Sequence, residues 1–176
     1  PARFRCLLMS SDIWMVVIAA VLALFAGLFA SADAALSSFS KARANELVAM
    51  ERGGAQRVKT ITDDPPRYLN TLLLLRMVAE TTSIVLVALV VADTFDVMWR
   101  RVLLAAGVMV LVSYVLIGVA PRTLGRQHSE KVALWTAGFT IAATRVLGPV
   151  PRVLIFIGNA LTPGKGFSEG PFASEA

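Results

Sequence analysis

The sequence has very few residues of the kinds that build soluble metal and redox sites. Its 176 residues include a single cysteine, Cys6, and a single histidine, His128. These counts exclude a disulfide framework, a cysteine-ligated zinc site, an iron–sulfur cluster and any histidine cluster. Charged residues are also scarce, at 16% of the chain, against about 25% in ordinary soluble domains. Disorder is excluded because a disordered chain combines high charge with low hydrophobicity.

What the chain has in abundance is apolar surface. Hydrophobic residues make up 56% of it, and the mean hydropathy is +0.69. A soluble domain of this length could not bury so much apolar surface, so we expect an integral membrane protein. The net charge of +5 fits basic loops that fix membrane orientation better than it fits a nucleic-acid partner. No nucleophile–base pair is visible at membrane depth, so neither an enzyme nor a catalytic residue is expected.

Three apolar runs are long enough to cross a bilayer, which takes about 20 residues. They cover residues 13–39, 68–92 and 102–120, and the last is followed by Pro121. Each is expected to be a helix, because a single segment in lipid has no other way to satisfy its backbone. The fold class predicted is an all-α membrane protein with three transmembrane helices and several short interfacial helices.

A fourth apolar region, Val132 to Leu161, is divided in the middle by the sequence "LGPVPR". We expect two interfacial or re-entrant half-helices, at about residues 129–148 and 150–161, because proline and glycine interrupt the run. A broken fourth span is the alternative. The transmembrane domain is thus expected over residues 13–161.

The two ends of the chain are expected to be an extracellular segment, residues 1–12, and a Gly/Pro/Ser-rich linker, residues 162–176. The chain begins at Pro1 and stops within this polar stretch. We therefore expect it to be a fragment of a longer protein.

Basic residues gather in the loop between the first two spans and in the tail after Pro121. By the positive-inside rule, the loop and the C-terminus are cytoplasmic and the N-terminus is outside, although Arg3 and Arg5 argue weakly against this. Within the stretch from Lys41 to about Ile61, the first half is expected to form a short amphipathic surface helix that breaks at Gly53-Gly54.

Three charged residues lie inside the predicted spans: Asp33, Arg76 and Glu80. Charges at membrane depth are costly, so they usually face a protein interior, a cavity or an ion pathway. Near Asp33 are the hydroxyls of Ser31 and Ser37, and such oxygens suit Mg²⁺ or Na⁺. An inert, hydrogen-bonded acid at a helix end is the alternative.

Glu80 lies about halfway along the second span, with Arg76 four residues before it and Ser83 three residues after it. This spacing permits an ion pair that neutralises itself within one helix. Such a pair can be purely structural, or it can open to admit an ion.

The first span also carries small residues at intervals of four, which places them on one face. Such a face lets another helix approach closely, within the chain or across a dimer. The residues are Ala19, Ala23, Gly27, Ser31 and Ala35.

Three stretches of the sequence together resemble the membrane helices of one protein family. "LFASADAALSSFSKARANEL" is similar to the end of that family's first membrane helix, and "DDPPRYLNTLLLLRMVAETTSIVL" to its second. "GVAPRTLGRQHSEKVAL" resembles the end of its third helix, where a "G-E-x-x-P-K" motif leads into "R-x-P-E-x-V-A". The family that they resemble is the CNNM/CorC family of magnesium transporters, and the match covers most of residues 13–160.

The resemblance implies a three-helix transmembrane domain, a cytoplasmic belt of short helices and a homodimer in the bilayer. It further implies Mg²⁺ transport across the plasma membrane, with Na⁺ as the coupling ion. In full-length relatives a CBS-domain pair follows and binds nucleotide. A nucleotide is therefore expected to act only through that region, which would begin where this chain stops.

The sequence departs from the family pattern at the positions that matter for an ion. Asp33 stands where the family has Glu, Glu80 where it has Asn, and Gly118 where it has the acid of the third helix. We expect a cation site built from Asp33, Ser31, Glu80, Ser37 and backbone oxygens from Gly118 to Pro121. The alternative is a non-transporting membrane anchor that dimerises a cytoplasmic CBS-type sensor.

Overall fold

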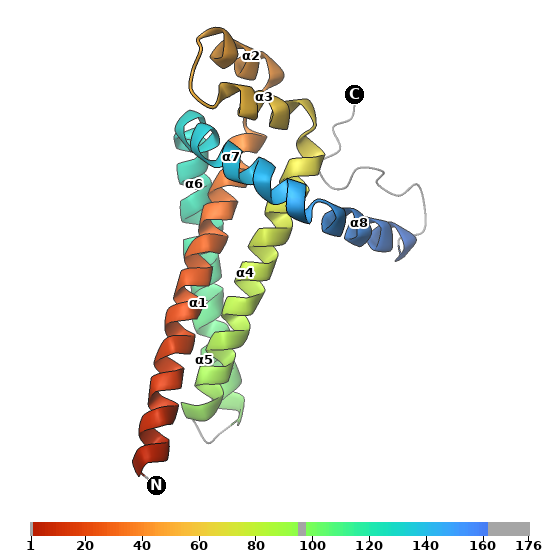
Figure 1. Ribbon diagram of the computed structural model, residues 1–176. Coiled ribbons are helices and arrows are strands. Elements are labelled where there is room, and N and C mark those ends of the chain that lie inside the picture. Colours follow the sequence, from red (N-terminus) through yellow and green to blue (C-terminus); the bar gives the residue numbers. More distant parts are fainter. Residues whose placement is uncertain (1, 95–97, 162–176) are drawn as a thin grey trace. The chain divides into compact units, whose positions relative to one another are not determined.

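The computed structural model describes residues 2–94 and 98–161, and side chains within residues 12–91 and 98–157. Throughout these ranges the regular elements are all helical, which confirms the predicted all-α class (Figure 1). The predicted linker, residues 162–176, lies outside the described residues. The elements are α1 Ala2–Ser37, α2 Lys41–Ala49, α3 Ala55–Asp63, α4 Pro65–Thr94, α5 Met98–Val112, the π-helix η1 Ser113–Val119, α6 Ala120–Gln127, α7 Ser129–Leu147 and α8 Pro149–Leu161.

Within the described residues, three helical segments are long and apolar enough to cross a membrane: Asp12–Ser37, Pro65–Val91 and Met98–Gln127. This confirms the three predicted spans. The second begins at Pro65 because proline is well tolerated in the first turn of a helix, where its missing N–H has no partner to lose.

The third span continues past Pro121, where the sequence suggests an end. The reason is that the backbone hydrogen bonds change before the proline, from the α-helical pattern of four residues to the π-helical pattern of five. In η1 the Ala120 N–H donates to the Val115 carbonyl oxygen, five residues back, so the wider turn admits the proline ring. The next bond in this register would join residue 121 to the Leu116 carbonyl, and Pro121 has no N–H to make it.

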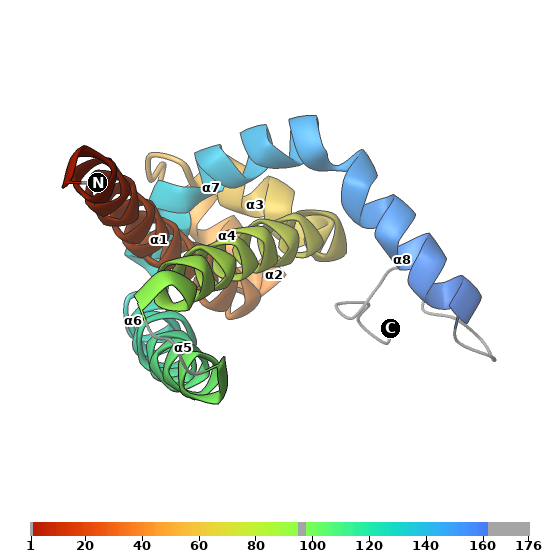
Figure 2. The same ribbon diagram turned by 90° about the horizontal axis from the view of Figure 1, so that it is seen from below.

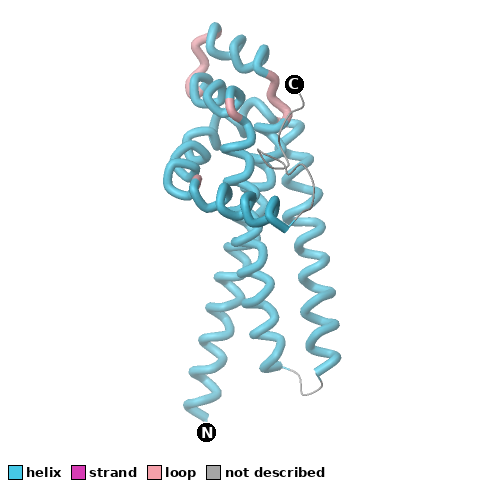
Figure 3. The backbone as a smooth tube through the Cα atoms, turned by 90° about the vertical axis from the view of Figure 1, so that its right-hand side faces the viewer, coloured by secondary structure: helices cyan, strands magenta, loops and turns pink. Residues whose placement is uncertain are grey.

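The described chain divides into two compact units. We call residues 2–28 and 76–121 the span unit, and residues 29–75 and 122–161 the short-helix unit. In the span unit the long helices run side by side (Figure 3). There α4 contacts α1 through Ser83, whose buried Oγ donates a hydrogen bond of 2.8 Å to the Ala19 carbonyl oxygen.

The span unit has a close helix–helix approach at Gly27 of α1. A Cβ atom added there would lie 2.7 Å from the Leu116 carbonyl oxygen and 3.2 Å from Cγ of Pro121. Ala19 and Ala23, on the same face of α1, are also buried. The small-residue face is therefore a packing surface, as predicted: it contacts α4 at Ala19 and the third span at Gly27.

The short-helix unit has a core of small and branched apolar side chains together with the ring of Tyr68. Ser40 caps α2 by accepting a hydrogen bond from the Arg43 N–H at 3.2 Å. The predicted break at Gly53-Gly54 is confirmed: Gly54 has φ of +88°, a conformation that favours glycine, and α3 follows. The buried core residues are Ala32, Ala35, Leu36, Ala44, Val58, Ile61, Tyr68, Leu69, Leu72, Ala133 and Ala137.

Helices α7 and α8 correspond to the two expected half-helices, and they meet at a bend of 64° between Leu147 and Pro149 (Figure 2). The Gly148 N–H still bonds to the Thr144 carbonyl at 2.9 Å, and Pro149 then opens α8 as its first residue. By length and composition the bent pair also qualifies as one broken span, so the two alternatives for this region both stay predictions.

Replacing Gly27 by Leu should destabilise the span unit. The new side chain would overlap backbone atoms at Leu116, and overpacking of this kind costs about 1–3 kcal/mol. The gain in helix propensity, about 1 kcal/mol, offsets only part of it. Thermal unfolding in detergent measures the loss.

Ala20→Leu is the matched control, because Ala20 is an exposed residue seven positions earlier in the same helix and should accept a leucine without loss. If Gly27→Leu unfolds at the same temperature as Ala20→Leu, the close contact at Leu116 does not exist.

Candidate cation site and its surroundings

Asp33 lies one turn before the C-terminal end of α1, between the buried Ala32 and Ala34. Its side chain is half-buried, and its carboxylate oxygen Oδ1 is shielded from solvent. Asp33 therefore faces protein, as a charge in an otherwise apolar span should. Of the two neighbouring serines, Ser31 is half-buried and Ser37 is exposed.

Helix α6 packs against α1 at the turn that holds Ser31. A Cβ atom on Gly125 would overlap the Ser31 carbonyl oxygen, so only glycine allows this approach. Gly125 was not among the predicted site residues. The signal in the sequence that could have indicated it is a glycine one helical turn after Pro121. Within the short-helix unit, Gly125 lets α6 contact the α1 backbone at Ser31, two residues before Asp33.

Glu80 is paired with Arg76 one turn earlier in α4. The Arg76 Nε atom lies 3.7 Å from Glu80 Oε2, and the two side chains are only 18% and 23% exposed. The predicted i,i+4 ion pair therefore forms. At 3.7 Å it is a charge contact without a close hydrogen bond, so the Glu80 carboxylate keeps capacity for another ligand.

Gly118 lies within η1, where a Cβ would come 3.2 Å from the Ser113 carbonyl oxygen. The π-helix is rare and occurs frequently at functional sites. Here its last two residues, Gly118 and Val119, belong to the stretch whose backbone oxygens were predicted to bind an ion. The Leu116 carbonyl, which Pro121 cannot bond, is the oxygen that approaches Gly27.

The predicted site residues fall in both units. Ser31, Asp33 and Ser37 belong to the short-helix unit, whereas Glu80 and Gly118 belong to the span unit. Within the described residues, no three His, Cys, Asp or Glu side chains come together as a metal-binding group. A cation site in this chain would have to complete its coordination with hydroxyl, carbonyl and water oxygens, which Mg²⁺ accepts. The composition of the site stays a prediction.

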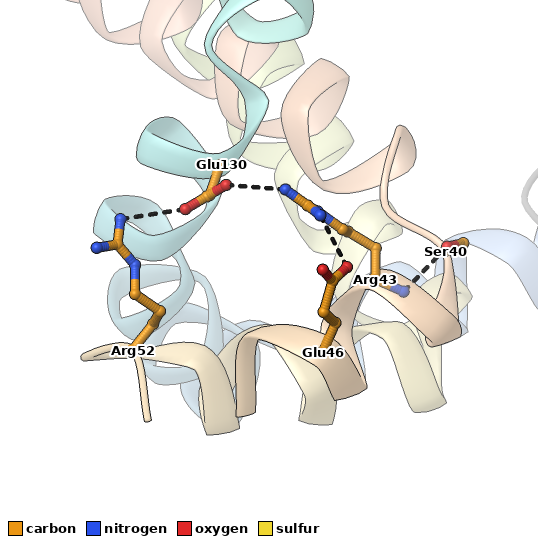
Figure 4. Close-up of polar contacts among 5 residues, drawn as sticks. All are labelled: Ser40, Arg43, Glu46, Arg52 and Glu130. Carbon is orange, nitrogen blue, oxygen red and sulfur yellow. Dashed lines mark hydrogen bonds and ion pairs between the residues drawn. The ribbon is translucent and has the colours of Figure 1, made fainter. Parts of the chain in front are cut away.

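A second polar cluster, which the sequence analysis missed, joins the short helices (Figure 4). Glu130, in the first turn of α7, binds two arginines: Arg43 of α2 at 3.3 Å and Arg52 of the following loop at 3.1 Å. Arg43 also pairs with Glu46 at 2.7 Å. The hydrogen bond and charge of Glu46 raise the pKa of Arg43 above its usual value, so this guanidinium stays protonated at physiological pH.

Comparison with known proteins decides the family. Residues 17–176 match the profile of the cyclin M transmembrane N-terminal domain, CNNM. The chain belongs to the CNNM family. This confirms the resemblance drawn from the three motif stretches, and it agrees with three helices suited to cross a membrane. The chain is accordingly a multi-pass membrane domain.

Two mycobacterial relatives are similar to this CNNM domain. They are the UPF0053 protein Mb2387c of Mycobacterium bovis and the UPF0053 protein Rv2366c of Mycobacterium tuberculosis. Each is 47% identical over 149 residues, which is 85% of this chain and 34% of the relative. The CNNM domain thus spans about a third of the length of the relatives it matches.

Replacing Glu130 by Gln should loosen the contact of α2 and its following loop with α7 in this CNNM domain. The substitution leaves the guanidinium groups of Arg43 and Arg52 without a carboxylate between α7 and the loop. Because the pairs are partly exposed, global stability should change little. Hydrogen exchange of residues 41–52 should nevertheless become faster, and high salt should have the same effect on the wild type.

Glu51→Gln serves as the control, since Glu51 is an exposed carboxylate of the same loop outside this cluster. Equal exchange rates in wild type and Glu130→Gln would mean that the cluster does not hold the loop.

Proposed function

We propose that this domain is the membrane part of a divalent-cation transporter that moves Mg²⁺ across the plasma membrane. Membership of the CNNM family supports this. The observation that carries the proposal is Asp33, a carboxylate with a shielded oxygen in the most apolar span of the chain. Such a residue is expensive to keep in a membrane unless it serves a pathway.

Mg²⁺ prefers octahedral oxygen coordination and sheds its water reluctantly. Asp33 supplies charge, and Ser31 and Ser37 supply hydroxyl oxygens. With few protein ligands the ion keeps part of its hydration shell. It is therefore held weakly enough to be released, which transport requires.

Glu80 is the second carboxylate in the proposal, and Arg76 is its competitor. The loose 3.7 Å contact lets the guanidinium neutralise Glu80 when no ion is present. An arriving cation would displace Arg76 from the carboxylate. In this proposal the guanidinium of Arg76 and the cation compete for the same carboxylate, so Arg76 weakens ion binding at Glu80.

Na⁺ is proposed as the coupling ion, because it also accepts carboxylate and hydroxyl oxygens. The N-terminus is proposed to lie outside, with α2, α3 and the C-terminus in the cytoplasm. The basic residues of the 41–67 loop, including the Arg43 and Arg52 of the Glu130 cluster, support this orientation. A homodimer is proposed as the working form, with nucleotide acting only through a CBS-type region.

The second candidate function is a non-transporting anchor that dimerises a cytoplasmic sensor. Gly118 favours the anchor, because this glycine replaces the third-helix acid of the family motif and cannot supply a carboxylate to an ion. The lack of a three-residue acidic or histidine group among the described residues favours it too.

Mg²⁺ should raise the thermal stability of the purified chain, and the effect should depend on Asp33. A ligand that binds only the folded state stabilises it, by about 2.7 kcal/mol at a hundred times its Kd. Asp33→Asn should abolish the Mg²⁺-dependent shift in Tm, and Glu80→Gln should weaken it. Arg76→Gln should preserve or strengthen it, because the competing cation is gone.

Asp63→Asn is the matched control, an exposed aspartate at the end of α3 that should leave the shift unchanged. A folded Asp33→Asn that keeps the full Mg²⁺ shift would place the ion elsewhere. No shift in the wild type would favour the anchor.

A further inference from the structure

The short-helix unit has a groove between α3 and α7 that the cation site does not use. Its volume is about 380 Å³, within the range of small-molecule sites. Two arginines line it, one from each helix, and its floor is made of small and apolar residues. The lining residues are Arg57, Gly138, Ile141, Ala142 and Arg145.

The groove places two guanidinium groups on one face of α7. The Arg57 side chain crosses from α3 and lies over Gly138, where an added Cβ would come 3.0 Å from its Nη1 atom. Arg145 is seven residues beyond Gly138, two turns along the same face. Glycine at position 138 thus provides the space in which Arg57 lies.

Both arginines lack an acidic partner within the described part of the chain. The ion pairs there join Arg43, Arg52 and Arg76 to glutamates, and none includes Arg57 or Arg145. Two guanidinium groups that line one groove without an anion are suited to a phosphate, because their planar forks bind its oxygens in pairs.

The surface around the groove is apolar and aromatic, which indicates where the phosphate comes from. Trp135, Phe139 and Val146 are exposed on α7, on the face next to the one that lines the groove, and Trp135 is 76% exposed. Helix α8 continues with exposed Phe156 and Leu154. Tryptophan and arginine next to an exposed apolar helix are typical of the membrane interface, at the level of the headgroups.

We propose that this groove binds the headgroup phosphate of an anionic phospholipid such as phosphatidylglycerol, while the apolar faces of α7 and α8 contact its chains. Basic pockets beside membrane helices recognise anionic headgroups in this way. The site is independent of the proposed cation transport, because it shares no residue with it. It would make the position of α3 against α7 sensitive to membrane composition.

The test titrates the full chain in a neutral detergent with short-chain phosphatidylglycerol, short-chain phosphatidylcholine or inorganic phosphate. Binding is followed by the shift in Tm and by native mass spectrometry. Phosphatidylglycerol should bind and raise the Tm, and the other two should not. Arg57→Gln and Arg145→Gln should each weaken binding about fivefold, which corresponds to about 1 kcal/mol per arginine near anionic lipid.

Arg152→Gln is the matched control, an exposed arginine of α8 outside the groove, and it should bind as the wild type does. Gly138→Leu is a second variant that keeps both charges but removes the space occupied by Arg57. It should weaken binding as Arg57→Gln does. Circular dichroism confirms that each variant is folded.

Three outcomes would overturn the proposal. Undiminished binding by the Arg57→Gln, Arg145→Gln double variant would show that the groove is not the site. An equal loss in Arg152→Gln would show diffuse attraction to the basic surface. A shift in Tm with inorganic phosphate as large as with phosphatidylglycerol would make a free phosphate the ligand.

Discussion

The close approach of α1 to the third span, at Gly27 and the Leu116 carbonyl, is the contact on which the rest of the span unit depends. Lipid gives membrane helices no hydrophobic reason to associate, so they rely on backbones that pack closely. The face of α1 built from Ala19, Ala23 and Gly27 supplies that packing. The third span meets it with η1, whose wider turn also carries the helix past Pro121.

Polar and charged side chains in the spans need partners within the protein, because lipid offers none. Ser83 donates a hydrogen bond to a backbone carbonyl of α1, and Arg76 lies 3.7 Å from Glu80 and neutralises it. Asp33 stands six residues beyond Gly27 in the same helix, with one oxygen shielded from solvent. The charged residues proposed to bind the ion, Asp33 and Glu80, are thus also the ones that are most costly to place in an apolar span.

Local patterns were enough to predict much of this chain. Hydropathy predicted the three spans, and Gly53-Gly54 the break before α3, since both signals are local in sequence. Glu130 was not predicted, because its partners Arg43 and Arg52 are 87 and 78 residues away. Gly125 was missed for the same reason, and η1 because its register has no clear sequence signature. The sequence placed Asp33, Ser31, Ser37, Glu80 and Gly118 in their helices, but a shared ion site depends on how segments distant in sequence pack together, which local patterns do not encode.

The most direct test of the central claim is Mg²⁺ flux into proteoliposomes that contain this chain, followed with a trapped Mg²⁺-sensitive dye under an imposed Na⁺ gradient. The account predicts flux above that of protein-free vesicles, abolished by Asp33→Asn and kept in Asp63→Asn. Flux at the protein-free level in folded wild type would contradict transport and support the membrane anchor. Undiminished flux in Asp33→Asn would contradict the role given to that carboxylate.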